Sequence, residues 1–206
     1  MVNQIVVGLD IGQRRDFSGI VVLEAKEQVD AARDPITYDF QRRTVIELPH
    51  LERIRLGTPF AQIVDRVAQV VSDPRLKGST LVADASGLGA PVVESLRAAR
   101  LPCRLIPAQI TGGGDESYDG EFYRVPKRDL VVGLQILFDR WPFEMAQGLP
   151  AMKALVEELI NFKATRSGAG NLKYAGPRDD LTMSLALAWW WLRKKVAQSQ
   201  PQGRLI

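Results

Sequence analysis

With 206 residues, of which 46% are hydrophobic and 25% charged, the chain has the size and composition of a soluble globular protein with one sizeable domain. Its longest strongly apolar run, residues 185–192, falls well short of the roughly 20 residues that cross a membrane, and its first residues lack a secretion-signal pattern, so we expect a cytoplasmic protein. A single cysteine and a single histidine exclude an internal disulfide and a cysteine-rich or histidine-rich metal site, and the net charge of +3 agrees with an acidic partner without establishing one.

Three short apolar runs near the N-terminus predict β-strands. They lie at residues 5–10 (IVVGLD), at 17–25 (FSGIVVLEA) and within 36–48 (ITYDFQRRTVIEL). Because short polar turns separate them, we expect an antiparallel meander.

Helices and strands alternate through the rest of the chain. Residues 60–71 place apolar side chains on one helical face, and Pro74 follows the end of this segment. The next expected elements are, in order, a strand at 79–85, a helix at 90–100, a strand at 103–110, a mobile glycine-rich loop at 110–126, helices at 127–140 and 150–161, a hairpin at 161–176 and a helix at 178–195. The pattern predicts an α/β fold: a mixed β-sheet flanked by helices, with an additional β-hairpin before the last helix. We expect one domain, residues 1–195, and a flexible tail, residues 196–206.

Aspartates occur where three of these elements end or begin. Asp10 closes the first strand, Asp84 lies near the end of the strand at 79–85, and Asp179 and Asp180 open the last helix. If the two strands are neighbours, their carboxylates converge at one edge of the sheet. Ionised carboxylates brought together repel one another, and divalent cations with a preference for oxygen ligands, such as Mg²⁺ or Mn²⁺, reverse this balance. Two such ions can drive phosphodiester hydrolysis without a histidine.

Seven segments, in this order, resemble the nuclease domain of phage large terminase subunits, which has a ribonuclease H-like fold. The segments are GLDIGQRRDFSGIVV, ERIRLGTPFAQIVDRV, LVADASGLGAPVVESL, ITGGG, VPKRDL, SGAGNLKY and RDDLTMSLALAW. The resemblance implies that Asp10, Asp84 and Asp180 are catalytic metal ligands, with Asp10 bridging two Mg²⁺ or Mn²⁺ ions. Asp179 would lie beside the site and replace or assist Asp180.

The same resemblance implies a function and a set of partners. Members of this family cut both strands of concatemeric viral DNA during genome packaging. The expected partners are therefore double-stranded DNA and a packaging ATPase domain or other terminase or portal components, in the cytoplasm of a bacterial host.

Two departures from the family pattern qualify this expectation. Large terminases join the nuclease to an ATPase motor, yet the sequence contains no G-x-x-x-x-G-K-[ST] phosphate-binding loop. We therefore expect an excised nuclease domain or a separate nuclease gene product. Arg178 stands where the family often has a histidine, which concerns the surroundings of the ligands and not the ligands themselves.

Four basic residues are candidates for contact with DNA phosphates. Lys127 and Arg128 begin the predicted helix at 127–140, whereas Arg14 and Arg15 follow the first strand. Basic pairs of this kind more often lie on a solvated surface, so phosphate contact is a hypothesis.

Two features of the last helix allow more than one interpretation. Asp179 follows Pro177 and suits a helix N-cap as well as a metal site. Three consecutive tryptophans, residues 189–191, are about 100° apart around a helix, so we expect at least one to reach the rim and contact an ATPase domain or partner.

Three other functions compete with a terminase nuclease. A Holliday-junction resolvase of the RuvC type would use the same fold and prefer four-way DNA. A packaging or docking module would carry the acidic residues without cutting DNA. The stretch GLDIG also resembles the first phosphate-binding segment of actin-like sugar kinases, but 206 residues are too few for two kinase lobes, and no Thr or Ser follows Gly12 directly.

Overall fold

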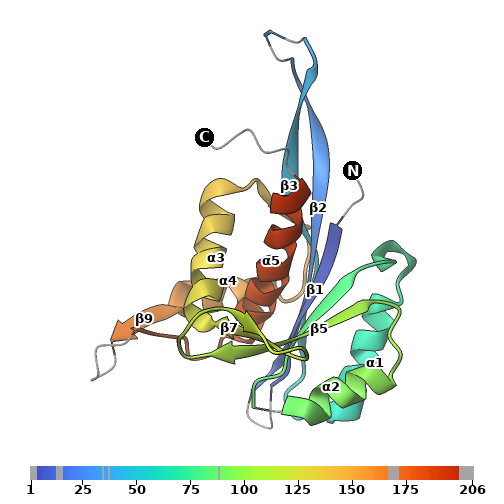
Figure 1. Ribbon diagram of the computed structural model, residues 1–206, viewed down its shortest axis with the longest axis vertical. Coiled ribbons are helices and arrows are strands. Elements are labelled where there is room, and N and C mark those ends of the chain that lie inside the picture. Colours follow the sequence, from blue (N-terminus) through green and yellow to red (C-terminus); the bar gives the residue numbers. More distant parts are fainter. Residues whose placement is uncertain are drawn as a thin grey trace.

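The computed structural model describes residues 4–12, 16–33, 35–36, 38–87, 89–166 and 172–199. Within these residues, eight strands form one mixed sheet in the order β6-β7-β5-β4-β1-β2-β3-β8 (Figure 1). Strand β1 pairs antiparallel with β2, and β2 with β3, which confirms the predicted meander. On its other side β1 pairs parallel with β4, which pairs parallel with β5. The predicted α/β fold with a mixed sheet is also confirmed.

The strands of the sheet are β1 (Gln4–Asp10), β2 (Ser18–Arg33), β3 (Phe40–Ile54), β4 (Thr80–Asp84), β5 (Arg104–Thr111), β6 (Ser117–Tyr118), β7 (Tyr123–Pro126) and β8 (Phe143–Met145). The helices are α1 (Phe60–Val71), the short 3₁₀ helix η1 (Pro74–Leu76), α2 (Gly89–Ala98), α3 (Lys127–Arg140), α4 (Met152–Asn161) and α5 (Asp180–Ser199). The predicted hairpin before the last helix is β9 (Lys163–Arg166) with β10 (Leu172–Ala175), and its SGAG turn lies outside the described residues. None of the described helices is long and apolar enough to span a membrane.

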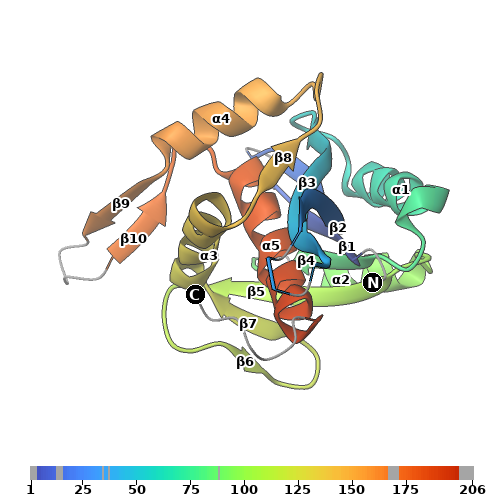
Figure 2. The ribbon, with the colours of Figure 1, turned by 90° about the horizontal axis from the view of Figure 1, so that it is seen from above.

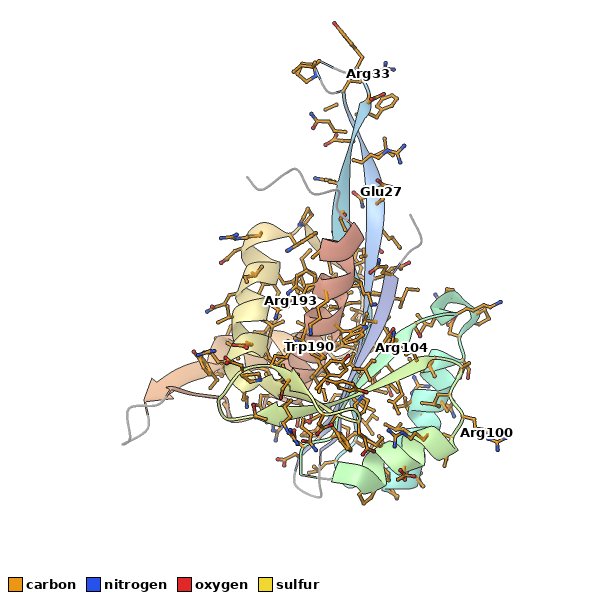
Figure 3. All side chains as sticks on the ribbon, in the orientation of Figure 1. Glu27, Arg33, Arg100, Arg104, Trp190 and Arg193 are labelled. Atoms are coloured by element: carbon orange, nitrogen blue, oxygen red, sulfur yellow. The ribbon has the colours of Figure 1, made fainter. Side chains whose placement is uncertain are left out.

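Strands β2 and β3 are longer than predicted and project from the body as a hairpin (Figure 1). Its outer part is exposed to solvent, and ion pairs connect its two strands: Lys26 with Glu47 at 2.6 Å and Arg42 with Glu27 at 3.3 Å. Arg33 lies near the tip, far from the packed interior that contains Trp190 (Figure 3). The apolar pattern ends where the hairpin leaves the core, which is why this extension was not predicted.

The glycine-rich segment at 110–126 is more ordered than expected. The prediction of a mobile loop is wrong for β6 and β7, which extend the sheet beside β5. The rings of Tyr118 and Tyr123 stack across these strands at 4.4 Å between centroids. Two further differences are the unpredicted strand β8 and the continuation of α5 through the first four residues of the expected tail, with Val196 buried.

Helices cover both faces of the sheet (Figure 2). Helix α1 and Leu96 of α2 pack on one face with alternate residues of β1, such as Val7 and Leu9. Helices α3, α4 and α5 share the other core with residues such as Val6 of β1. The period-2 alternation of strand side chains therefore divides the interior into two hydrophobic cores, one on each side of the sheet.

Helix α5 lies directly on the backbone of β1 and β2. A Cβ atom at Gly8 would stand 1.9 Å from the carbonyl oxygen of Ser184, and one at Gly19 would stand 2.4 Å from the Ser184 Oγ. Only glycine permits an approach this close. The two glycines therefore allow the first turns of α5 to rest on the sheet next to the end of β1.

All three tryptophans of α5 are buried, so the prediction that one reaches the rim is wrong. Trp189, Trp190 and Trp191 are 1%, 1% and 5% exposed. Trp189 packs edge-on against Trp141, and the other two pack against Tyr123 of β7. A helix that is apolar on every side is buried on every side, and here the sheet, α3 and the β6–β7 segment surround it.

Candidate active site

Asp10 and Asp84 end neighbouring parallel strands. The register pairs Leu9 of β1 with Ala83 of β4, so the two following aspartates leave the sheet at the same edge. Asp180, the first residue of α5, lies near them because α5 packs along β1 and β2. The structure thus brings Asp10, Asp84 and Asp180 to one end of the sheet, with Asp179 beside them.

The carboxyl groups of Asp10 and Asp84 lie within hydrogen-bonding reach of each other. Burial raises the pKa of Asp10 well above its usual range, and the negative charges of Asp84, Asp180 and Asp179 raise it further, against an opposing effect of Lys127. The Asp10 backbone N–H donates to the Ser184 Oγ at 3.2 Å. The site therefore disfavours the ionised form of Asp10 relative to water.

Asp84 is held by the turn that follows β4. Its Oδ1 accepts a hydrogen bond from the Ser86 N–H at 2.7 Å, and the Ser86 Oγ accepts one from the Ile110 N–H of β5 at 2.6 Å. Burial raises the pKa of Asp84, while the hydrogen bonds from Ser86 and the charge of Lys127 act in the opposite direction. The side chain is thus fixed between β4 and β5.

Asp180 is 6% exposed, and its Oδ2 has no hydrogen-bond partner among the described residues. Burial raises its pKa to about 6, with a further rise from the charge of Glu158 and an opposing effect of Arg53. The Ser184 hydroxyl donates to the Asp180 carbonyl at 2.7 Å, one helical turn on. A buried carboxylate oxygen without a partner is costly, so this atom is suited to a cation.

Asp179 occupies the position before the helix, but its side chain is used elsewhere. Its carbonyl accepts the first helical hydrogen bond, from the Met183 N–H at 2.7 Å. Its carboxylate forms an ion pair with Lys127 at 2.7 Å. The Asp179 carboxylate is therefore engaged by Lys127, and its role as a metal ligand stays a prediction.

Of the two predicted DNA-binding residues that the structure describes, Lys127 lies among the acids. It begins α3, pairs with Asp179 and opposes the pKa rise of Asp10 and Asp84. Arg128 instead points to the surface, where it pairs with Asp129 at 3.1 Å. Arg14 and Arg15 lie outside the described residues.

Two residues near the acids were missed in the sequence. Ser184 joins the backbone of Asp10 to that of Asp180, and its spacing of four from Asp180 was a signal that one helical face carries both. Glu158 affects Asp180 from α4, and no local pattern marks a glutamate in the middle of a helix as buried.

The donor set fits hard divalent ions, because every candidate ligand is a carboxylate. Among the described residues, no three side chains of His, Cys, Asp or Glu are grouped closely enough to hold a metal ion. Sharing an ion among Asp10, Asp84 and Asp180 would therefore require their side chains to rotate toward one another. The Oδ2 of Asp180 is buried and has no hydrogen-bond partner among the described residues, so contact with a cation would offset its desolvation.

No protein-family model and no curated protein sequence matches the chain. Several solved structures are similar to the chain. The large terminase nuclease of thermophilic phage G20c with bound magnesium is 24% identical, with a TM-score of 0.60 over 92% of this chain and 82% of that chain. The nuclease domain of the Thermus phage P74-26 large terminase is 22% identical, with a TM-score of 0.56 over 91% and 78%. The chain therefore has the ribonuclease H-like fold of phage large-terminase nuclease domains.

Proposed function

We propose that the chain is a metal-dependent DNA endonuclease of the phage terminase type, which cuts concatemeric viral DNA during genome packaging. The observation that supports this proposal is that Asp10, Asp84 and Asp180 lie together at one end of the sheet. The fold around them is that of terminase nuclease domains. Their raised pKa values mark a place where ionised carboxylates are costly without a cation. The similar G20c nuclease has been solved with bound magnesium and with bound cobalt.

In this proposal Asp10, Asp84 and Asp180 hold two divalent ions, Mg²⁺ or Mn²⁺, and Asp179 assists them. Bound ions of this kind supply an activated water and stabilise the leaving oxygen of an in-line phosphodiester hydrolysis. The chain's own residues hold the ligands in place: Ser184 fixes the backbone of Asp10, and the turn after β4 fixes Asp84.

Lys127 has two roles in the proposed site. It forms an ion pair with Asp179, and its positive charge lowers the pKa of Asp10. With divalent ions held by the acids, the Lys127 ammonium group would be available to a DNA phosphate. We assign the activity to the domain at residues 1–195, acting in the host cytoplasm on double-stranded DNA with a packaging ATPase domain or other terminase or portal components.

Plasmid cleavage tests the proposal. Supercoiled plasmid is incubated with the purified chain and Mn²⁺ or Mg²⁺, in parallel with Asp10→Asn, Asp84→Asn and Asp180→Asn. The parent is expected to nick and linearise the plasmid, and each variant to lose this activity. A parent that cuts no better than the variants would identify a docking module instead. Faster cutting of a four-way junction than of linear duplex would favour a RuvC-type resolvase.

A further inference from the structure

Glu158 is a buried acid that lies outside the proposed ligand set. It belongs to α4, is 4% exposed, and reaches α5 across the core. Its Oε2 accepts hydrogen bonds from the Thr182 N–H at 2.8 Å and from the Thr182 hydroxyl at 3.1 Å. A carboxylate from one helix thus contacts the first turn of another.

This contact gives a hydrogen-bond acceptor to an N–H group in the first turn of α5. The first N–H groups of a helix have no partner within the helix, and a residue before the helix usually supplies one. Here the carboxylate of Asp179 is engaged by Lys127 instead. Glu158 accepts from Thr182 in its place, and its negative charge also suits the positive end of the helix dipole.

Arg53 compensates the charge of Glu158. It comes from β3, forms an ion pair with the Glu158 Oε1, and has a side chain that is only 17% exposed. Its guanidinium also lies over the ring of Phe17, 5.0 Å from the centroid. Removing one partner of such a buried pair leaves the other charge uncompensated, so Arg53 and Glu158 depend on each other.

We propose that Glu158 and Arg53 act together as positioning residues, holding the first turn of α5 so that Asp180 is placed for metal binding. This inference rests on the proposed function. The Oδ2 of Asp180 forms no hydrogen bond with the described residues, so this atom does not fix the position of the side chain. Its placement therefore depends on the backbone of the turn, which Glu158 holds at Thr182 and Ser184 holds at the Asp180 carbonyl.

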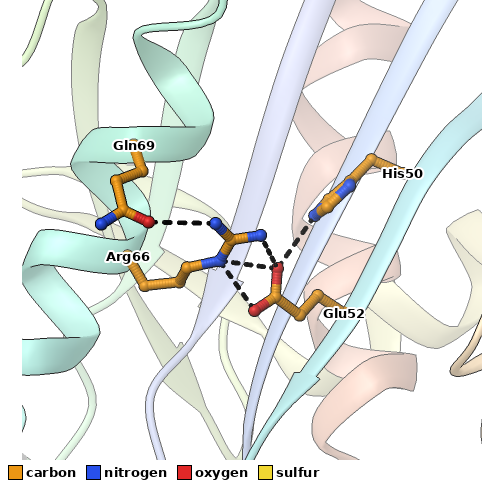
Figure 4. A network of polar contacts seen from close by, with 4 residues as sticks. All are labelled: His50, Glu52, Arg66 and Gln69. Atoms are coloured by element: carbon orange, nitrogen blue, oxygen red, sulfur yellow. Dashed lines mark hydrogen bonds and ion pairs between the residues drawn. The ribbon is translucent and has the colours of Figure 1, made fainter.

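The same strand offers a matched control on the opposite face of the sheet. Glu52, next to Arg53 in β3, pairs with Arg66 of α1 at 2.8 Å and with His50 at 3.2 Å (Figure 4). This network also joins the sheet to a helix through a carboxylate and a guanidinium. The network joins β3 to α1, whereas the proposed metal ligands belong to β1, β4 and α5. Loss of the Glu52 carboxylate should therefore leave metal binding unchanged.

Calorimetric titration of Mn²⁺ tests the inference without DNA. The full chain is compared with Glu158→Gln, Thr182→Val and Glu52→Gln, at a temperature well below the unfolding transition of each. Glu158→Gln is expected to weaken Mn²⁺ binding about tenfold, as for other residues that orient metal ligands. Thr182→Val, which removes one hydroxyl contact, should weaken it about threefold. Glu52→Gln should retain parental affinity.

A second readout separates positioning from general damage. In plasmid cleavage, Glu158→Gln should require roughly tenfold more Mn²⁺ for half-maximal rate and regain most of the parental rate at saturation. Parental affinity in both Glu158→Gln and Thr182→Val would overturn the inference, as would an equal loss in Glu52→Gln. If Glu158→Gln does not fold, Thr182→Val decides alone. A parent that binds no Mn²⁺ would overturn the proposed function itself, and the inference with it.

Discussion

The two faces of the sheet carry helices that contribute differently to the molecule. Helix α1 buries one apolar stripe, centred on Val67, and leaves its other side in solvent. Helix α5 is buried on all sides from Leu181 to Leu192. A helix held on one side can shift on its sheet, whereas one enclosed by the sheet and two other helices has its position determined by many contacts. Of the acids of the proposed site, Asp180 belongs to the enclosed helix, whereas Asp10 and Asp84 end strands of the sheet.

The largest expected effect is on catalysis and concerns the two neighbouring acids at the start of α5. Asp180→Asn should lower plasmid cleavage by about 1,000-fold, since it removes a proposed direct ligand. Asp179→Asn should lower it by about tenfold, because it releases Lys127 without removing that ligand. Initial rates of nicking at saturating Mn²⁺ measure both. Equal losses of cleavage rate in the two variants would indicate that Asp179 is also a direct metal ligand.

Next comes the contact between α5 and the sheet. Gly8→Ala places a Cβ atom 1.9 Å from the Ser184 carbonyl, so it should destabilise the chain by about 3 kcal/mol or more. Urea denaturation measures the free energy of unfolding. Gly112→Ala is the control, since a Cβ there meets no atom within 4 Å, and it should change stability by less than about 0.5 kcal/mol. A tolerated Gly8→Ala would mean that α5 is not held tightly against β1.

A third effect is the pH dependence of stability without metal. Asp180 has a folded pKa of about 6, above its unfolded value near 3.8, so the folded chain binds this proton more tightly. The contribution of this proton to the free energy of unfolding is fully present below pH 4 and is lost as the pH rises through 6. The loss is about 3 kcal/mol at most. Asp10 and Asp84 act in the same direction.

Thermal unfolding with and without Mn²⁺ measures this effect. Mn²⁺ should raise the melting temperature more at pH 7 than at pH 5, because protons compete with the metal at lower pH. The pH dependence should shrink in Asp180→Asn. An equal Mn²⁺ effect at both pH values would indicate that the ions bind elsewhere.

The smallest expected effect is on the α1 face. Val67→Ala removes two buried methyl groups and should destabilise the chain by about 2 kcal/mol, measured by urea denaturation. Its Mn²⁺ affinity should nevertheless equal that of the parent. A weaker affinity would show that the two faces of the sheet are coupled, which the comparison above does not predict.

Local sequence patterns were sufficient for much of the fold. The apolar period of 3.6 residues predicted α1 at 60–71, as observed. The helix expected at 127–140 is α3. Asp10 and Asp84 each end a buried strand, so their carboxylates were expected to converge if the two strands are neighbours, and the strands are neighbours. Their role as ligands stays a prediction.

The remaining features depend on partners distant in sequence. Glu158 and Arg53 are 105 residues apart, and either residue alone resembles an ordinary surface charge. The tryptophans of α5 are all buried because β7 and α3 close over them. The all-round apolar character of the helix indicates burial, but nothing within the helix indicates which elements cover it. Strands β6 and β7 form because β5 offers them an edge, although their glycine-rich surroundings suggested a loop.

The hydrogen bond between Asp10 and Ser184 spans 174 residues, and this separation has a consequence for synthesis. Asp10 is synthesised before the other strands of the sheet, whereas α5, which completes the site, follows all of them in the sequence. Contacts this distant form late in folding, because a long loop must close before they are made. A nascent chain would therefore hold an incomplete site, and the proposed cleavage of DNA would await the docking of α5.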